Sequence, residues 1–234
     1  IKKLSNIGLL STGFLTQMET LIAGVSHRNA FDVATDEDFW ARVRSGYRLK
    51  PDYINLENGY YCIVPQETLN RYISRVKDVN FQGSWYMRNH RFDDNIEIRK
   101  KLAKLVGATP EEVVLTRNTT ESLDTVISGY DWKPADEAVM ALQDYGAMLD
   151  MFKFQARRYG LVNKRVSVPL HPKDDQEIVS LYENAITPNT RLLMVSHMVN
   201  ITGQILPVKK IAEMAHRHNV DVLVDGAHCV GHFE

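Results

Sequence analysis

Hydrophobic residues recur with a helical period through the first half of the chain. In residues 36–48, 68–79 and 94–106 the apolar positions lie three or four apart, which predicts amphipathic helices. In the last stretch Ile98, Leu102 and Leu105 form one stripe, and Gly107 suits the C-terminal cap. A short apolar run at residues 53–56, directly before the turn at Asn58 and Gly59, predicts a strand.

From residue 113 onward, short apolar runs alternate with longer stretches of helical period. The pattern predicts strands at 113–116, 138–142, 191–196 and 220–225, and helices at 121–130, 147–159, 176–185 and 208–219. Strands joined through helices form a mostly parallel sheet that is covered on both faces. The predicted fold is therefore a three-layer α/β/α domain. We place the large domain at residues 51–234, with its layers regular from about residue 65, after an N-terminal segment at residues 1–50.

The composition argues against several classes of protein, among them nucleic-acid-binding and disulfide-rich proteins. The 234 residues include 28 basic and 29 acidic side chains, for a net charge of −1, which gives no sign of a nucleic-acid-binding face. The two cysteines, Cys62 and Cys229, lie far apart and outside any CxxC motif, which argues against a disulfide framework or a zinc site. Cys229 is better explained as a small buried hydrophobe. The sequence contains no GxGxxG, Walker or HExxH motif.

The N-terminal stretch has two interpretations. The chain begins at Ile1, and Lys2 and Lys3 precede a weakly apolar segment at residues 4–25. This segment is either the remnant of an export signal, which would place the protein in the periplasm or outside the cell, or a helix packed on the body of a cytoplasmic protein. Polar residues interrupt every apolar run of about 20 residues, so we expect no membrane span.

Three of the predicted strand-to-helix turns carry polar residues with ambiguous roles. Thr119 and Thr120 lie at a helix N-terminus, where they either bind a phosphate or cap the helix. Tyr145 follows a strand and either stacks on a planar ring or closes the core. Asn200 precedes Gly203 in an irregular segment and either donates to a ligand or makes an Asx-turn.

The fourth turn is the most informative, because Asp225 comes directly after the apolar run at residues 222–224. A carboxylate at the end of a buried strand is costly unless it is paired. His228, three residues later, is either that partner or a second residue facing a ligand. Ligands bind at the carboxyl ends of strands in open α/β sheets, so a shared site at this edge is expected.

Taken together in chain order, these motifs resemble the class V aminotransferases, which are fold-type I enzymes that use pyridoxal 5′-phosphate (PLP). The resemblance rests on Asn-Thr-Thr-Glu at 118–121, Asp-Tyr at 144–145, Asn-Ile-Thr-Gly at 200–203 and Asp-Gly-Ala-His at 225–228. The segments at 53–59 and 143–148 are most similar to the isopenicillin-N-epimerase-like branch. The resemblance covers roughly residues 50–234.

The resemblance implies a role for each of these residues. Thr119 and Thr120 match the positions that hold the cofactor phosphate, and Tyr145 matches the ring that stacks on the pyridine. Asn200 and His228 match residues near the 3′-oxygen, and Asp225 matches the aspartate paired with the pyridine nitrogen. A protonated ring nitrogen makes the cofactor an electron sink.

The resemblance also implies parts that these residues do not supply. The family's Schiff-base lysine, its substrate-carboxylate arginine and its small C-terminal domain are expected beyond Glu234. Lys209 and Lys210 lie on the predicted helix at 208–219 and are not credible substitutes for that lysine. We therefore expect these residues to be the N-terminal portion of a longer enzyme.

The implied function is a PLP-dependent reaction on an amino-acid-like small molecule through an external aldimine, of epimerase, aminotransferase or lyase type. By resemblance we expect a homodimer. One alternative is a cysteine desulfurase or C–S lyase, although Tyr145 replaces the histidine usual in desulfurases. Another is a non-catalytic scaffold with the PLP fold, and a third is an unrelated nucleotide-binding or small-molecule α/β module.

Overall fold

The computed structural model describes residues 13–59 and 61–232. The chain forms two compact units, Ile1–Leu115 and Thr116–Glu234. The division predicted at residue 50 remains a prediction from the sequence.

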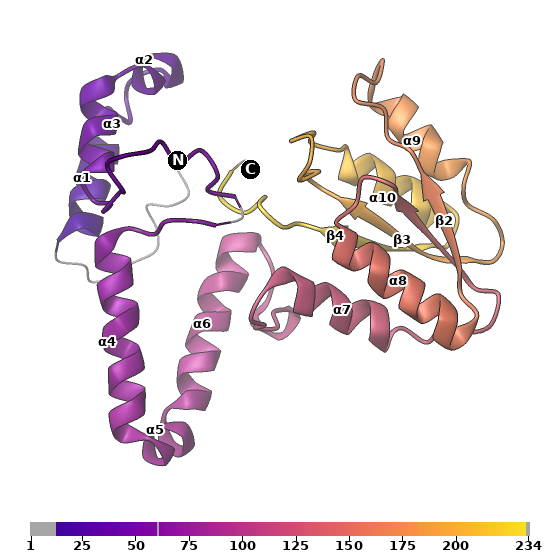
Figure 1. The fold of residues 1–234 in the computed structure, drawn as a ribbon, viewed down its shortest axis with the longest axis horizontal. Helices are drawn as coiled ribbons and strands as arrows, with labels where there is room; N and C mark the ends of the chain where they lie inside the picture. The colour runs from indigo at the N-terminus through magenta and orange to yellow at the C-terminus, as the bar shows by residue number, and fades with distance from the viewer. Residues whose placement is uncertain (1–12, 60, 233–234) are drawn as a thin grey trace. The chain divides into compact units, whose positions relative to one another are not determined.

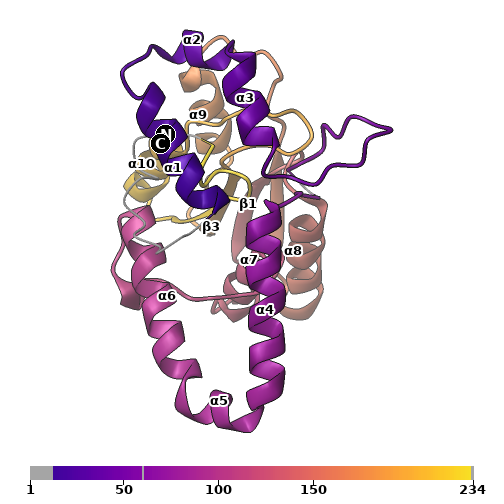
Figure 2. The same cartoon turned by 90° about the vertical axis from the view of Figure 1, so that its left-hand side faces the viewer.

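The described part of the N-terminal unit is helical. Its elements are α1 (Phe14–Val25), α2 (Ala30–Ala34), α3 (Glu37–Arg44), α4 (Gln66–Gln82), α5 (Ser84–Asn89), α6 (Arg91–Val106) and the 3₁₀ turn η2 (Pro110–Glu112). Figure 2 shows α4 running to the short α5, from which α6 returns. Gly107 ends α6 in the left-handed conformation (φ 72°), as predicted for a C-cap.

The strand predicted at residues 53–56 is wrong. These residues form no strand in the described chain, and Ile54 and Leu56 are 82% and 89% exposed. An apolar run becomes a strand only where a neighbouring strand pairs with it.

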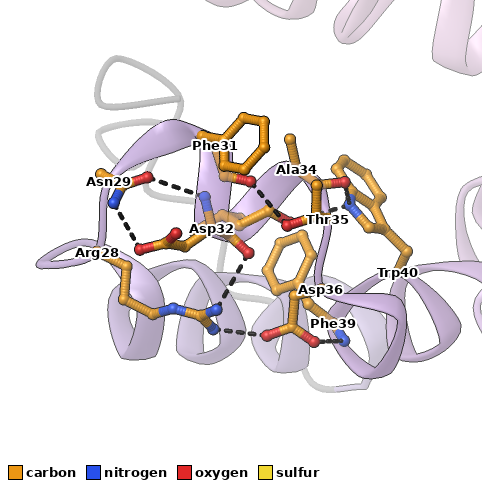
Figure 3. Close-up of polar contacts among 10 residues, drawn as sticks. Arg28, Asn29, Phe31, Asp32, Ala34, Thr35, Asp36, Phe39 and Trp40 are labelled. Atoms are coloured by element: carbon orange, nitrogen blue, oxygen red, sulfur yellow. Dashed lines mark hydrogen bonds and ion pairs between the residues drawn. The ribbon is translucent and has the colours of Figure 1, made fainter.

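Side-chain caps hold the loop between α1 and α3 (Figure 3). The Arg28 guanidinium lies 2.6 Å from Asp36 Oδ2 and donates to the carbonyl of Asp32. Asp36 Oδ1 also accepts from the Phe39 N–H at 2.9 Å and so caps α3. Asn29 caps α2 by accepting from the Asp32 N–H at 2.8 Å. These contacts all join residues that are close in sequence.

The C-terminal unit is an α/β sandwich (Figure 1). Its strands are β1 (Glu137–Ala141), β2 (Val162–Val166), β3 (Thr190–Ser196) and β4 (Asp221–Asp225). Its helices are α7 (Thr119–Gly129), α8 (Gly146–Tyr159), α9 (Asp175–Glu183) and α10 (Val208–Arg217). The strand order is β2-β1-β3-β4, and every pairing is parallel.

Apolar side chains pack on both faces of this sheet. Ala138 and Met140 of β1 join a core with α7 and α8, whereas Val139 and Ala141 join a second core with α9 and α10. Figure 1 shows the same two helix pairs on opposite sides of the strands. This alternation confirms the predicted three-layer α/β/α fold.

In this part of the chain, one predicted strand is absent from the structure, and one observed strand was not predicted. The run at residues 113–116 forms no strand, and Val114 is 81% exposed. The strand β2 was missed, because its sequence Val-Asn-Lys-Arg-Val lacks an apolar run. As an edge strand β2 has one neighbour and an open side, so it tolerates polar residues.

The structure leaves the two interpretations of the N-terminal stretch open. Residues 14–25 form the helix α1, but residues 1–12, which include Lys2 and Lys3, lie outside the described part. Among the described residues, no helix is long and apolar enough to cross a membrane.

Candidate functional site

The carboxyl ends of β1, β3 and β4 lie at one edge of the C-terminal unit, because these strands are adjacent and parallel. Asp144 and Tyr145 follow β1, Asn200 follows β3, and the turn at 225–228 begins at the last residue of β4. Three of the four predicted motifs therefore share one edge.

The helix α7 brings the fourth motif to the same edge. At its C-terminal end, Tyr130 Oη lies 2.6 Å from Asp221 Oδ2 and 3.1 Å from the carbonyl oxygen of Arg191. Both partners are at the amino ends of their strands. The 11 residues of α7 span about 16 Å, which matches the length of five-residue β4. Because Leu123 and Ile127 pack in the core under the sheet, the N-terminus of α7 lies toward the carboxyl edge.

Asn118, not a threonine, caps α7. Its side-chain oxygen accepts from the Glu121 N–H at 2.9 Å, so the alternative that Thr119 or Thr120 caps the helix is wrong. Within the described chain, the hydroxyls of Thr119 and Thr120 make no hydrogen bond to protein. These hydroxyls and the backbone N–H groups of the same two threonines remain available to an anion.

An acidic residue in the first turn of α7 is paired, so it does not oppose anion binding. The Glu121 carboxylate accepts from the Arg117 backbone N–H at 2.8 Å and from Arg117 Nε at 3.1 Å. The hydrogen bond from Arg117 holds the pKa of Glu121 below its ordinary value. The N-terminus of α7 therefore keeps the positive end of its dipole.

Asp225 is buried, at 6% exposure, and only part of its carboxylate is used by the protein. Its Oδ1 accepts from the Ala227 N–H at 3.0 Å. Among the described residues, Oδ2 has no hydrogen-bond partner and no cation pairs with the group. The expected alternative of an Asp225–His228 pair is therefore absent from the described chain. A buried carboxylate with one oxygen free is suited to a cationic or N–H-bearing ligand.

The turn after β4 holds His228 in an unusual backbone conformation. His228 has φ 68°, in the left-handed region that favours glycine, and its side chain is half-buried. Cys229 next to it is 7% exposed, which agrees with the prediction of a buried small hydrophobe. Burial, and secondarily the charge of Asp225, raise the pKa of the Cys229 thiol, so it is a poor nucleophile.

Tyr145 and Asn200 occupy different environments at this edge. Tyr145 precedes the first residue of α8, and its half-buried side chain packs against the core shared by α7 and α8. Asn200 is exposed at the tip of a hairpin, where Met198 pairs with Ile205 and the Val199 N–H donates to the Gln204 carbonyl at 2.9 Å. The packing role proposed for Tyr145 is thus present, and its stacking role stays a prediction.

Asp144, which belongs to the Asp-Tyr motif but had no predicted role of its own, is a buried acid at 5% exposure. Its Oδ2 accepts from the Ala141 N–H at 2.7 Å, and its Oδ1 accepts from Ser196 Oγ at 2.7 Å and from the Ser196 N–H at 3.3 Å. Burial and, less strongly, the charge of Asp225 together raise the pKa of Asp144 to about 6 despite these donors. A second acid after a strand end was the available signal, but its partner in β3 is 52 residues away.

Other clefts and side-chain groups in the described chain lack the residues predicted to bind the cofactor. A cleft of about 690 Å³ lies within the N-terminal unit beside Trp40, Tyr47 and Tyr53, and none of the predicted cofactor residues lines it. In the described residues, no group of three or more His, Cys, Asp or Glu side chains is arranged to hold a metal. Lys209 and Lys210 are exposed on α10, and Lys210 pairs with Asp175 at 2.8 Å.

The chain is similar in sequence to the proteins of one known family. The profile of the family "Aminotransferase class-V" matches residues 63–234. Isopenicillin N epimerase of Streptomyces clavuligerus is 28% identical over 192 residues, and that of Amycolatopsis lactamdurans is 30% identical over 196. Each alignment covers 82% of this chain and 48% or 49% of the relative. A probable cysteine desulfurase of Mycolicibacterium paratuberculosis is 26% identical over 94% of this chain.

Solved structures show the same architecture. A mutant of C-DES with glycine covalently linked to its PLP cofactor superposes with a TM-score of 0.73 at 26% identity, over 80% of this chain and 50% of that one. The complex of the cystine C–S lyase C-DES with cysteine persulfide gives a TM-score of 0.68 at 28% identity. The chain spans about half the length of the two epimerases and 32% of the probable cysteine desulfurase.

Proposed function

Because the chain belongs to the class V aminotransferase family, we propose that it forms the cofactor-binding part of a PLP-dependent enzyme that acts on an amino-acid substrate. The family and the PLP-bound C-DES structures indicate pyridoxal phosphate as the cofactor, in agreement with the sequence prediction.

The observation that carries this proposal is the half-satisfied carboxylate of Asp225. The protein places a charge at 6% exposure and, in its described part, gives Oδ2 no donor. Oδ2 is thus left open to a donor, and a protonated ring nitrogen would supply both that donor and the opposite charge. The residues present therefore fit the ring end of PLP.

The phosphate end of the cofactor fits the N-terminus of α7. Thr119 and Thr120 offer hydroxyl donors, and their backbone N–H groups add donors at the positive end of the helix dipole. We assign the phosphate to these two threonines. Tyr145 would cover one face of the ring, and Asn200 and His228 would approach its 3′-oxygen.

The bound cofactor supplies an electron sink for negative charge at the substrate Cα. Asp225 would hold the proton on the pyridine nitrogen, since its free Oδ2 is an acceptor. The two buried apolar cores pack against the sheet and would hold Tyr145 and Asp225 in place at its carboxyl edge.

Two reaction classes have specific support. Similarity to the isopenicillin N epimerases, at 28% and 30% identity, favours an epimerase-like reaction at Cα. The superposition on C-DES favours C–S bond cleavage as the second candidate. Both begin with an amino acid bound at the same cofactor.

We also propose that the full-length protein is a homodimer. The helix α4 buries none of its residues, and Val76, Phe81, Trp85 and Phe92 on α4 to α6 are 52%, 91%, 57% and 61% exposed. Exposed apolar faces of this kind mark protein interfaces. Sedimentation velocity of the full-length protein tests the proposal, and a monomer at micromolar concentration contradicts it.

PLP binding by the full-length protein tests the cofactor assignment. We expect a visible absorbance band on PLP addition, and about tenfold or greater weakening of binding in Asp225→Asn, because an amide cannot neutralise a protonated ring. Asp175→Asn is the matched control, since Asp175 is exposed and forms a surface ion pair with Lys210. An equal affinity in Asp225→Asn and Asp175→Asn contradicts the assignment.

Borohydride reduction distinguishes an enzyme from a non-catalytic scaffold. Reduction followed by peptide mass spectrometry should find PLP attached to a lysine of the full-length protein. PLP that binds but is never captured on a lysine would support the scaffold instead.

A further inference from the structure

The Asp144 carboxylate joins the ends of two strands that the sheet itself does not hold together there. The β1–β3 register extends from Glu137–Thr190 to Val139–Leu193. Asp144 Oδ2 binds the N–H of Ala141, two residues beyond that last pair, and Oδ1 binds Ser196, three residues beyond it. One buried side chain thus replaces the missing ladder contacts at the carboxyl edge.

The serine that Asp144 holds leads directly to Asp225. Ser196 is the register partner of Asp225 in the β3–β4 pairing. The next N–H along the chain, that of His197, donates to the backbone carbonyl of Asp225 at 2.9 Å. A continuous path of hydrogen bonds and strand pairing therefore runs from β1 through β3 to the last residue of β4.

From this path we infer that Asp144 is a positioning residue for the cofactor site, which fixes the end of β3 and thereby the placement of Asp225 relative to Tyr145. The inference rests on the PLP-binding function proposed above. Asp144 is adjacent to Tyr145 in sequence, so one carboxylate orders the groups on either side of the ring position. With its donors at 2.7, 2.7 and 3.3 Å, the side chain is fully engaged by protein.

Asp144 also acts on Asp225 through charge. Among the described residues, Asp144 interacts with Asp225 on β4 and with Tyr182 on α9. The charge of Asp225 raises the pKa of Asp144. Burial and the charge of Asp144 both raise the pKa of Tyr182. A cation beside Asp225 would lower the pKa of Asp144 from about 6, so its binding favours ionised Asp144. The affinity for a cation beside Asp225, such as the protonated ring of PLP, should therefore rise with pH up to about 6 and then level off.

The test compares PLP affinity in full-length Asp144→Asn, Ser196→Ala and a control, Asp150→Asn. Asp150 is exposed on α8 and forms an ion pair with Lys153, away from the predicted cofactor residues, so its variant should bind PLP like the wild type. We expect about tenfold weaker binding in Asp144→Asn and a smaller loss in Ser196→Ala, which keeps the charge and removes one of three donors. Asp144→Asn should also remove the rise in affinity between pH 5 and 6.

A merely structural role would lower stability in Asp144→Asn but leave the pH dependence of binding unchanged, which would overturn the inference. If Asp144→Asn does not fold, Ser196→Ala decides the outcome, and an affinity equal to that of Asp150→Asn overturns it. Failure of the wild type itself to bind PLP would instead refute the proposed function, so the two failures are distinguishable.

Discussion

The C-terminal unit buries apolar side chains on both faces of its sheet, whereas the N-terminal unit relies mainly on contacts between neighbours in the sequence. Phe152, Met194 and Ile211 are fully buried in the first. In the described part of the second, the buried hydrophobic residues are Val33, Phe39 and Ala103. Its Arg28–Asp36 ion pair joins residues that are only eight positions apart in the sequence.

This difference indicates where each unit obtains its stability. Burial of apolar area is the main favourable term in folding, and the two cores supply it to the C-terminal unit. Caps and ion pairs near the surface fix local geometry but contribute less. The predicted cofactor residues all lie in the well-packed unit, while the exposed apolar helices of the other unit suit a partner surface.

The largest expected difference in stability is between alanine variants of two phenylalanines, one in each unit. Phe152→Ala leaves a cavity in the core and should lower the free energy of unfolding by about 3–5 kcal/mol. Phe81 is 91% exposed in the single chain, so Phe81→Ala should change the free energy of unfolding by about 0.5 kcal/mol or less at protein concentrations where the protein is monomeric. Urea unfolding of the full-length protein at several concentrations measures both. A large, concentration-dependent loss in Phe81→Ala would show that a partner covers this side chain.

An intermediate effect is expected at the buried ion pair between β1 and β2. Glu137 Oε2 lies 2.8 Å from Lys164 Nζ and accepts from the hydroxyls of Thr187 and Thr190. Glu137→Gln should cost about 1–3 kcal/mol in the free energy of unfolding, because it leaves a half-buried ammonium without its partner.

The pH dependence follows from the same contacts. Burial raises the pKa of Glu137, but Lys164 and the two hydroxyls lower it more, so the folded-state value lies below the ordinary one. The contribution of Glu137 is therefore complete above the unfolded pKa and is lost as pH falls through the folded one. Unfolding curves between pH 3 and 7 (about the range of carboxyl titration) should show a shallower acid loss in Glu137→Gln. Equal slopes in variant and wild type would contradict this.

The smallest effects should distinguish two identical caps. Asn118 caps α7 of the C-terminal unit and Asn29 caps α2 of the N-terminal unit, each by accepting one N–H. Asn118→Ala should cost about 1 kcal/mol of global stability, because α7 packs on the core. Asn29→Ala should mainly increase local hydrogen exchange in α2, which buries only Val33 among its residues. An equal global loss in both variants would mean that the two units unfold together.

The errors in strand prediction have a common physical cause. The runs at 53–56 and 113–116 have strand-like composition but no pairing partner in the described chain, while β2 has a partner and little apolar character. Strand formation depends on a neighbour that is distant in sequence, so local composition misjudged all three. Helices were predicted better, because their hydrogen bonds are local.

The sequence by itself determined the three-layer fold, the family and the burial of a carboxylate at the end of β4, since periodicity and an apolar run before an acid are local features. Only the tertiary structure showed that α7 presents Thr119 and Thr120 at the edge where Asp225 lies. It alone also revealed that Asp144 bridges β1 and β3, because its carboxylate binds Ala141 of β1 and Ser196 of β3. These arrangements join residues tens of positions apart, and the packing of helices on the sheet, which no local pattern encodes, brings them together.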